Sequence, residues 1–305
     1  MREALEHLAR QTYDNFDVYV ITDSPETCDV GPKLKVTFMS SGPVTPNVKR
    51  MMAAKDSDAE IVALLDDDAF PVPHWLEAAS AHFTSAALLA VGGPGITPRS
   101  DSASQQASGA VYASPLVSAG FVYRYLPSRA RDVDDYPSCN LIVRREAFLK
   151  YVPECLRYWP GEDTKLCYLL TQGEGGRIVY DPAVAVYHHR RKLFWGHFRQ
   201  VWNYAVHRGF FAKRYRGSSL RPQYFIPSIF VLGNVAALAL LFAERVRVAA
   251  LVAGAVYVLC VALAVAAVRR THPASPPMIA IGIYLTHLTY GVGFVIGLLA
   301  PELDH

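Results

Sequence analysis

The chain has 305 residues, of which 51% are hydrophobic and 19% are charged, with a net charge of +3. This length fits one globular domain of about 200 residues plus a second part, and so small a charge argues against a nucleic-acid partner. Five cysteines without a C-x-x-C pair argue against a zinc site or a disulfide framework. The charged N-terminus, MREALEHLARQTYDNF, is not expected to be a signal peptide.

The first part of the chain alternates predicted helices with predicted strands. Apolar periodicity predicts helices over residues 3–13, 48–60 and 75–83, and strands over residues 16–23, 60–70 and 87–96. This alternation is typical of βαβ units, so we expect an α/β, Rossmann-like domain with a mainly parallel sheet. Ligands of such sheets bind beyond the carboxyl ends of the strands.

Acidic residues follow two of the predicted strands. Asp23 ends the first, and the run Asp66, Asp67 and Asp68 follows the apolar stretch EIVALL. Neighbouring carboxylates raise each other's pKa unless a cation is bound, and oxygen ligands suit Mg²⁺ or Mn²⁺ on substrate phosphates. The alternative is a solvated acidic turn that caps the next helix.

Six segments between residues 7 and 194 resemble, in order, family-2 glycosyltransferases with the GT-A fold. LLDDDAFPVPHWLE is similar to the segment in which an Asp-x-Asp holds a divalent ion on the nucleotide diphosphate. The other five are HLARQTYDNFDVYVITD, GPVTPNVKR, YPSCNLIVRREAF, WPGEDTKLCYLL and VYHHRRKLF. The resemblance implies an inverting transferase that uses a nucleotide-sugar, with UDP as the expected nucleotide.

The resemblance also implies roles for individual residues. Asp66 and Asp68 would bind Mn²⁺ or Mg²⁺, and we favour His189 over His188 to complete the metal shell. Asp163 would be the catalytic base, although Glu162 and Asp163 could instead only cap a helix. The nucleotide would contact Asp23, Lys49, Arg50 and Asp67, and the acceptor would contact Ser138, Asn140 and Glu162.

Three apolar stretches near the C-terminus are long enough to cross a bilayer. They run roughly over residues 224–243, 248–268 and 278–300, and a buried helix of a soluble bundle would normally keep a polar face. Basic residues before the first stretch and between the second and third favour a cytoplasmic location for residues 1–222. Three spans would then place the C-terminus outside.

The segment before these stretches combines aromatic and basic residues. From Pro182 to Gln223 there are nine Lys or Arg and no Asp or Glu, and Phe194, Phe198, Val201 and Ala205 share one helical face. This pattern predicts an amphipathic helix in the headgroup layer, near lipid phosphates, or alternatively a helix packed on the globular domain.

We therefore expect a GT-A-like catalytic domain over residues 1–190, an amphipathic interface helix and basic linker over 191–222, and three transmembrane helices over 223–305. The expected function is hexosyl transfer from a nucleotide-sugar to a lipid-linked or other glycan acceptor at the cell membrane. The alternatives are a processive polysaccharide synthase and an inactive membrane-anchored binding subunit. RQVWNYAVHRG lacks the Gln-x-x-Arg-Trp motif of the synthases, which speaks against the first of these.

Overall fold

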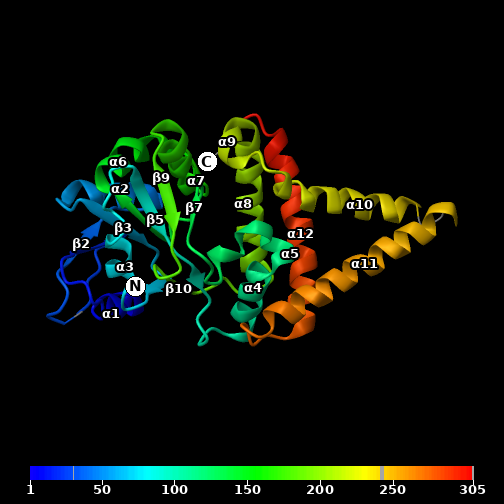
Figure 1. Cartoon of the computed structure of the whole chain (residues 1–305), viewed down its shortest axis with the longest axis horizontal. Helices are drawn as coiled ribbons and strands as arrows, with labels where there is room; N and C mark the ends of the chain where they lie inside the picture. The colour runs from blue at the N-terminus through cyan, green and yellow to red at the C-terminus, as the bar shows by residue number, and fades with distance from the viewer. Residues whose placement is uncertain (30, 241–243, 304–305) are drawn as a thin grey trace. The chain divides into compact units, whose positions relative to one another are not determined.

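The computed structural model describes residues 1–29, 31–240 and 244–303, which form two compact units (Figure 1). The first unit comprises residues 1–96 and 126–188. The second comprises residues 97–125 and the described chain from residue 189 onward. The predicted functional boundaries at residues 190 and 222 stay predictions.

The first unit is the α/β part of the chain. Its helices are α1 (Arg2–Leu8), α2 (Pro46–Asp56), α3 (Trp75–Ser80), α6 (Arg145–Tyr151) and α7 (Glu162–Tyr168), with a 3-10 turn at Val152–Cys155 and a π-turn at Leu169–Gly173. Its strands are β1 (Val18–Thr22), β2 (Val36–Ser40), β3 (Ile61–Leu65), β4 (Ala69–Pro71), β5 (Leu88–Gly92), β6 (Gly95–Ile96), β7 (Arg131–Val133), β8 (Asn140–Arg144), β9 (Arg177–Tyr180) and β10 (Val186–His188). Each predicted helix and strand of residues 3–96 overlaps one or two of these elements, whereas β2 was not predicted.

The strands form three sheets of mixed direction, so the prediction of a mainly parallel sheet was wrong. The five-stranded sheet has the order β3-β8-β5-β9-β7, and only β5 and β9 are parallel in it. In the three-stranded sheet β10 is antiparallel to β4 and parallel to β6, while β1 and β2 form a parallel pair. The cause is β8, which follows both β3 and β5 in the chain and inserts antiparallel between them.

The second unit is helical. It contains α4 (Ala103–Ala113), α5 (Pro115–Ser118), α8 (Trp195–Arg214), α9 (Arg216–Ser219), α10 (Ile226–Leu240), α11 (Glu244–Val268) and α12 (Pro276–Leu299), with 3-10 turns at Ala119–Arg124 and Pro222–Tyr224. The predicted amphipathic helix is present as α8. Val201 and Ala205 of the predicted shared face are buried together with His197, Gly209 and Ala212, whereas Phe194 precedes the helix and is exposed.

Two helices among the described residues are long and apolar enough to cross a membrane, not the three predicted. They cover Arg247–Val268 and Pro276–Leu299. The apolar helix before them, Pro222–Leu238, is shorter. The 15 residues of α10 span about 22 Å, less than the ~30 Å of a bilayer core, and the predicted residues 241–243 lie outside the described residues.

A buried histidine links three helices of the second unit. The Nδ1 of His197 hydrogen-bonds the Ser108 hydroxyl at 2.8 Å and its Nε2 hydrogen-bonds the Thr286 hydroxyl at 3.0 Å. His197 is fully buried. Burial and, after it, the positive charge of Arg190 lower the pKa of His197 to about 3. The neutral imidazole therefore serves as a structural link among α4, α8 and α12.

The second unit is expected to lose stability in acid because of His197. Below its ordinary pKa of 6.5, His197 is protonated in the unfolded chain but stays neutral in the folded state. The free energy of unfolding therefore falls as the pH drops from about 6.5 toward about 3. By pH 4.5 the loss is about 3 kcal/mol. Thermal unfolding in detergent across this range should detect it. A His197→Gln variant should have a flatter profile there, and equal slopes would contradict this assignment.

Candidate active site

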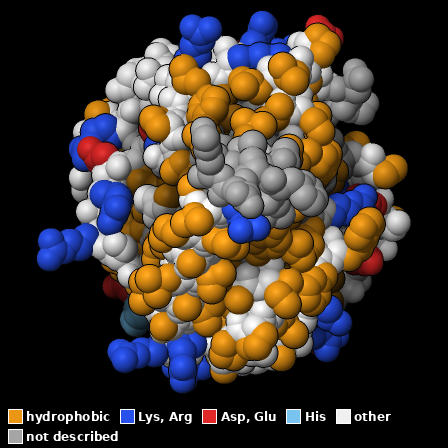
Figure 2. All heavy atoms as spheres, turned by 90° about the vertical axis from the view of Figure 1, so that its right-hand side faces the viewer, with side chains coloured by type: hydrophobic (Ala, Val, Ile, Leu, Met, Phe, Trp, Pro, Cys, Tyr) orange, Lys and Arg blue, Asp and Glu red, His pale blue; other side chains and the backbone are white. Residues whose placement is uncertain are grey.

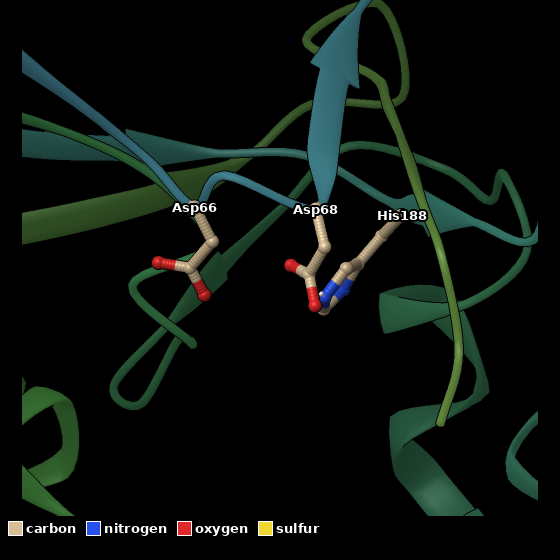
Figure 3. A group of neighbouring side chains, drawn as sticks. All are labelled: Asp66, Asp68 and His188. Carbon is tan, nitrogen blue, oxygen red and sulfur yellow. Dashed lines mark ion pairs between the residues drawn. The ribbon is translucent and has the colours of Figure 1, made fainter. Parts of the chain in front are cut away.

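Three potential metal ligands meet beyond the carboxyl end of β3. The run Asp66 to Asp68 connects β3 to β4, and β10 pairs antiparallel with β4 so that His188 lies opposite Ala69. Ligand atoms of Asp66, Asp68 and His188 all lie within 4.8 Å of one another (Figure 3). The Nε2 of His188 is 3.1 Å from Asp68 Oδ1. The side chain of Asp67, between the two, is exposed.

This donor set fits a divalent cation. Two carboxylates and one imidazole suit Mn²⁺, and the carboxylates also suit Mg²⁺. All three side chains are partly buried, with exposed fractions of 36% for Asp66, 26% for Asp68 and 15% for His188. The partial exposure leaves room for a ligand that carries its own oxygen atoms, such as a phosphate.

His188, and not the favoured His189, lies in this group. His189 Nδ1 pairs with Asp101 Oδ1, and both residues belong to the second unit. The reason is local geometry, because successive side chains of an extended segment point in opposite directions. Only one of two adjacent histidines can face the aspartates at the end of β10.

Arg50 connects the aspartate cluster to the acidic start of α7. Its guanidinium donates to Asp66 Oδ1 at 2.7 Å and to Glu162 Oε1 at 3.3 Å, and its side chain is 13% exposed. Burial alone would lower the pKa of Arg50, but Asp66 and Glu162 outweigh burial and raise it. The permanent positive charge of Arg50 thus links the acids after β3 to the acids at the start of α7, which are far apart in the sequence.

Glu162 and Asp163 begin α7 directly after Gly161. Gly161 has a φ of 113°, a conformation that glycine adopts without a steric penalty and that fixes the entry into the helix. Burial and the neighbouring Asp163 raise the pKa of Glu162 to about 7, although Arg50 opposes the shift. Asp163 is less buried, and its carboxylate accepts from the backbone N–H groups of Thr164 at 2.7 Å and Ser138 at 3.3 Å.

The predicted nucleotide contacts lie on α2 and at the end of β1. Lys49 Nζ donates to Asp23 Oδ1 at 2.5 Å, and Asp23 remains 60% exposed on its side chain. Lys49 and Arg50 are consecutive residues of α2. Lys49 contacts Asp23 after β1, and Arg50 contacts Asp66 after β3. The N-terminal half of α2, which starts at Pro46, therefore contacts the acids at both strand ends.

Two of the predicted acceptor residues, Ser138 just before β8 and Asn140 at its start, have different surroundings. Ser138 is buried and its backbone N–H binds Asp163. Asn140 is fully buried, its amide donates to the carbonyls of Gly93 at 2.6 Å and Val184 at 2.7 Å, and its Oδ1 accepts from Trp75 Nε1 at 2.8 Å. Asn140 thus joins three separate chain segments of the first unit.

Replacing Asn140 with alanine is expected to destabilise the first unit by about 3 kcal/mol. The change would leave two buried carbonyls and the buried Trp75 N–H without partners. Thermal unfolding of this variant, compared with Asn15→Ala at an exposed position, provides the measurement. Unfolding at the wild-type temperature would show that these hydrogen bonds contribute little.

The comparisons with known proteins concern the sequence family and the fold. Residues 1–152 match the sequence profile of the family described as glycosyl transferase family 2. No curated protein matches the chain in sequence. Among solved structures, the chain is similar to the mannosyltransferase PcManGT from Pyrobaculum calidifontis, in complex with GDP-Man and Mn²⁺, with 19% identity, a TM-score of 0.51, and coverage of 97% of this chain and 81% of that one.

A second similar structure is that of GalNAc-T7 with UDP, GalNAc and Mn²⁺. It is 15% identical with a TM-score of 0.42, and the match covers 68% of this chain and 45% of that one. The likeness to the mannosyltransferase establishes a GT-A-like α/β fold with mixed sheets.

Proposed function

We propose that this protein, a glycosyltransferase whose residues 1–152 match the profile of glycosyl transferase family 2, transfers one sugar from a nucleotide-sugar to an acceptor held at a membrane. The observation that carries the proposal is the convergence of Asp66, Asp68 and His188 beyond the end of β3. Arg50 joins this group to Glu162, next to the proposed base. The groups that would bind a diphosphate thus lie close to the acid that would activate the acceptor hydroxyl.

The donor would be held by the acids and bases around α2. Asp66, Asp68 and His188 would hold Mn²⁺ or Mg²⁺, which when bound neutralises charge on the diphosphate. Lys49 and Arg50 would face the nucleotide with Asp23 and Asp67, and a permanent guanidinium charge suits phosphate oxygens. We propose UDP as the nucleotide, and the GDP-Man bound by the similar mannosyltransferase makes GDP the first alternative.

Asp163 would act as the general base. An acceptor hydroxyl would lose its proton to the Asp163 carboxylate while its oxygen forms a bond to the anomeric carbon of the sugar. The bond from that carbon to the diphosphate oxygen breaks, the nucleoside diphosphate leaves, and the configuration inverts. Two backbone N–H groups, those of Thr164 and Ser138, orient the Asp163 carboxylate.

The acceptor would be a polyprenyl-phosphate-linked glycan, and the protein would lie in the cell membrane with its catalytic part in the cytoplasm. The exposed apolar side chains of the second unit and the nine basic residues between Pro182 and Gln223 support this assignment. Basic side chains would attract the phosphate and the lipid headgroups. Purified protein that glycosylated only soluble sugars would contradict a lipid-linked acceptor.

Calorimetric titration with UDP, GDP and dTDP, each with and without Mn²⁺, tests the donor site. Metal-dependent binding of one nucleotide, lost in an Asp66→Asn/Asp68→Asn variant, is the expected result. Binding that survives both substitutions would place the nucleotide elsewhere. Binding without any sugar transfer to lipid-linked or soluble acceptors would favour an inactive binding subunit, and long products would identify a processive synthase.

A further inference from the structure

Helix α8 packs lengthwise against α12. The contacts follow one another in the same order along both helices: His197 with Thr286, then Ala205 with Gly293, then Val206 with Gly297. Near the ends of both helices, Lys213 Nζ donates to the carbonyl of Ala300. From Thr286 to Ala300 this contact covers about 21 Å at the helical rise of 1.5 Å per residue.

The beginning of α12 is also covered by protein. Gly282 lies against Val111 of α4 and Leu193, and the ring of His287 hydrogen-bonds the Leu116 carbonyl of α5 at 3.0 Å. In the most apolar stretch of α12, 44% of the residues are buried, compared with 17% for α11. Helix α12 is therefore long and apolar enough to cross a membrane, and yet it packs against α4, α5 and α8 of the second unit.

Helix α8 cannot share a hydrocarbon environment with α12. Its outward side exposes Arg199, Asn203 and Arg214, and its aromatic residues Trp202 and Tyr204 lie between them. Each arginine near the centre of a bilayer costs about 3 kcal/mol. Helix α8 lies beside α12 from His197 to Lys213. If α12 crossed the bilayer, the exposed polar side chains of α8 would therefore lie in the hydrocarbon core.

Helices α10 and α11 have the opposite character. Both extend away from α8 and α12 (Figure 1), and this side of the molecule carries a broad hydrophobic surface around the residues drawn in grey (Figure 2). The stretches 226–243 and 248–268 contain no Asp, Glu, Lys or Arg. Large apolar side chains are more than half exposed along both helices, among them Ile229, Leu232, Val235, Leu251, Val258 and Leu263.

Basic residues flank the two helices where they join the rest of the unit. Arg216 and Arg221 precede α10, and Arg269 and Arg270 follow α11. Basic residues at both of these ends match the anionic headgroups of one leaflet. In a bilayer, acyl chains would contact the apolar side chains of both helices. Headgroups of one leaflet would contact the basic residues before α10 and after α11.

We infer that α10 and α11 form the membrane-embedded hairpin, with phospholipid acyl chains as its occupant, while α8 and α12 lie outside the hydrocarbon core. The chain then enters and leaves the bilayer on the same side. The C-terminus lies on the side of the catalytic unit, opposite to the location that three spans would give. The inference rests on the membrane placement of the proposed function and not on its chemistry.

The side of the C-terminus tests the inference directly. The full chain is expressed in bacteria with either a fluorescent protein that folds only in the cytoplasm or an alkaline phosphatase that is active only outside it, each fused after His305. Fluorescence without phosphatase activity is expected, and the reverse would overturn the hairpin. Extraction of membranes with alkaline carbonate is the separate test of membrane placement, since complete release of the chain would overturn both that placement and the hairpin.

Two glycine substitutions form a matched pair for the packing of α12. A side chain on Gly297 would overlap the backbone of Val206 in α8, whereas nothing lies within 4 Å of a side chain on Gly254 of α11. Gly297→Val should lower the unfolding temperature in detergent by roughly 5 °C or more, while Gly254→Val should leave it within ~1 °C. Equal behaviour of the two would mean that α12 stands free of α8. A Gly254→Val variant that dissociated an oligomer would indicate that a second copy of the chain, and not lipid, covers the hairpin.

Discussion

Substitution of both Asp66 and Asp68 by asparagine is expected to reduce kcat for sugar transfer by at least ~1000-fold. The two carboxylates and His188 are the only group of its kind among the described residues. An amide cannot supply the negative charge that holds a divalent cation against a diphosphate, and electrostatic stabilisation of the leaving group is a large part of such catalysis. Initial rates with the preferred nucleotide-sugar and saturating Mn²⁺ provide the measurement.

The control for this variant is Asp58→Asn, which removes an exposed acid shortly before β3. Its rate should stay within about twofold of wild type. Asp58 lies at the opposite end of β3 from the metal ligands, and solvent and salt largely screen an exposed charge there. Adding excess Mn²⁺ should not rescue the double variant. Near-normal turnover in the double variant would rule out a metal-bound diphosphate at this place.

Substitution of Asp163 by asparagine is expected to reduce kcat about 100- to 10,000-fold without weakening nucleotide binding. Asparagine keeps one oxygen that can accept from the N–H of Thr164 or Ser138, so the start of α7 should stay folded. It cannot take the acceptor proton. Single-turnover rates and the Kd for the nucleotide, measured on the same preparation, separate this loss from the loss at Asp66 and Asp68, which should affect both quantities.

Asp132→Asn serves as the comparison for Asp163, because Asp132 lies exposed on β7 and pairs with Arg177. It should leave both the rate and the Kd unchanged. A full rate in Asp163→Asn would assign the base to another acid, and Glu162 would be the first to test. A joint loss of rate and nucleotide binding would instead indicate that Asp163 positions the donor.

Much of the first unit could be predicted from local patterns. The apolar stretch before Asp66 predicted β3 and the position of the acids at its carboxyl end, because an uncharged apolar run changes there to three consecutive aspartates. The direction of β8 could not be predicted in the same way. Its residues Asn140 to Arg144 have an apolar pattern that suits a parallel or an antiparallel neighbour equally, and its partners β3 and β5 are both far away in sequence.

The candidate site shows the same limit. The sequence predicted that one of two adjacent histidines would join the aspartates, but the choice depends on which side of β10 faces β4, a property of tertiary pairing. The contact from Arg50 to Glu162 crosses 112 residues and has no local signal. Hydropathy predicted an apolar helix where α12 lies, but the contact of α12 with α8 has no signal in apolar composition.

The second unit is assembled from two separate pieces of the chain, and this limits how the protein can be shortened. Residues 97–125 belong to it although they lie between β6 and β7, and Ala107, Ala110 and Val111 of α4 are completely buried. Removing everything after residue 188 would delete His197, Leu193 and Gly282, the partners of Ser108 and Val111. Such a shortened protein would keep the proposed catalytic residues and yet expose an apolar helix in the middle of its chain, so it should aggregate where the complete protein does not.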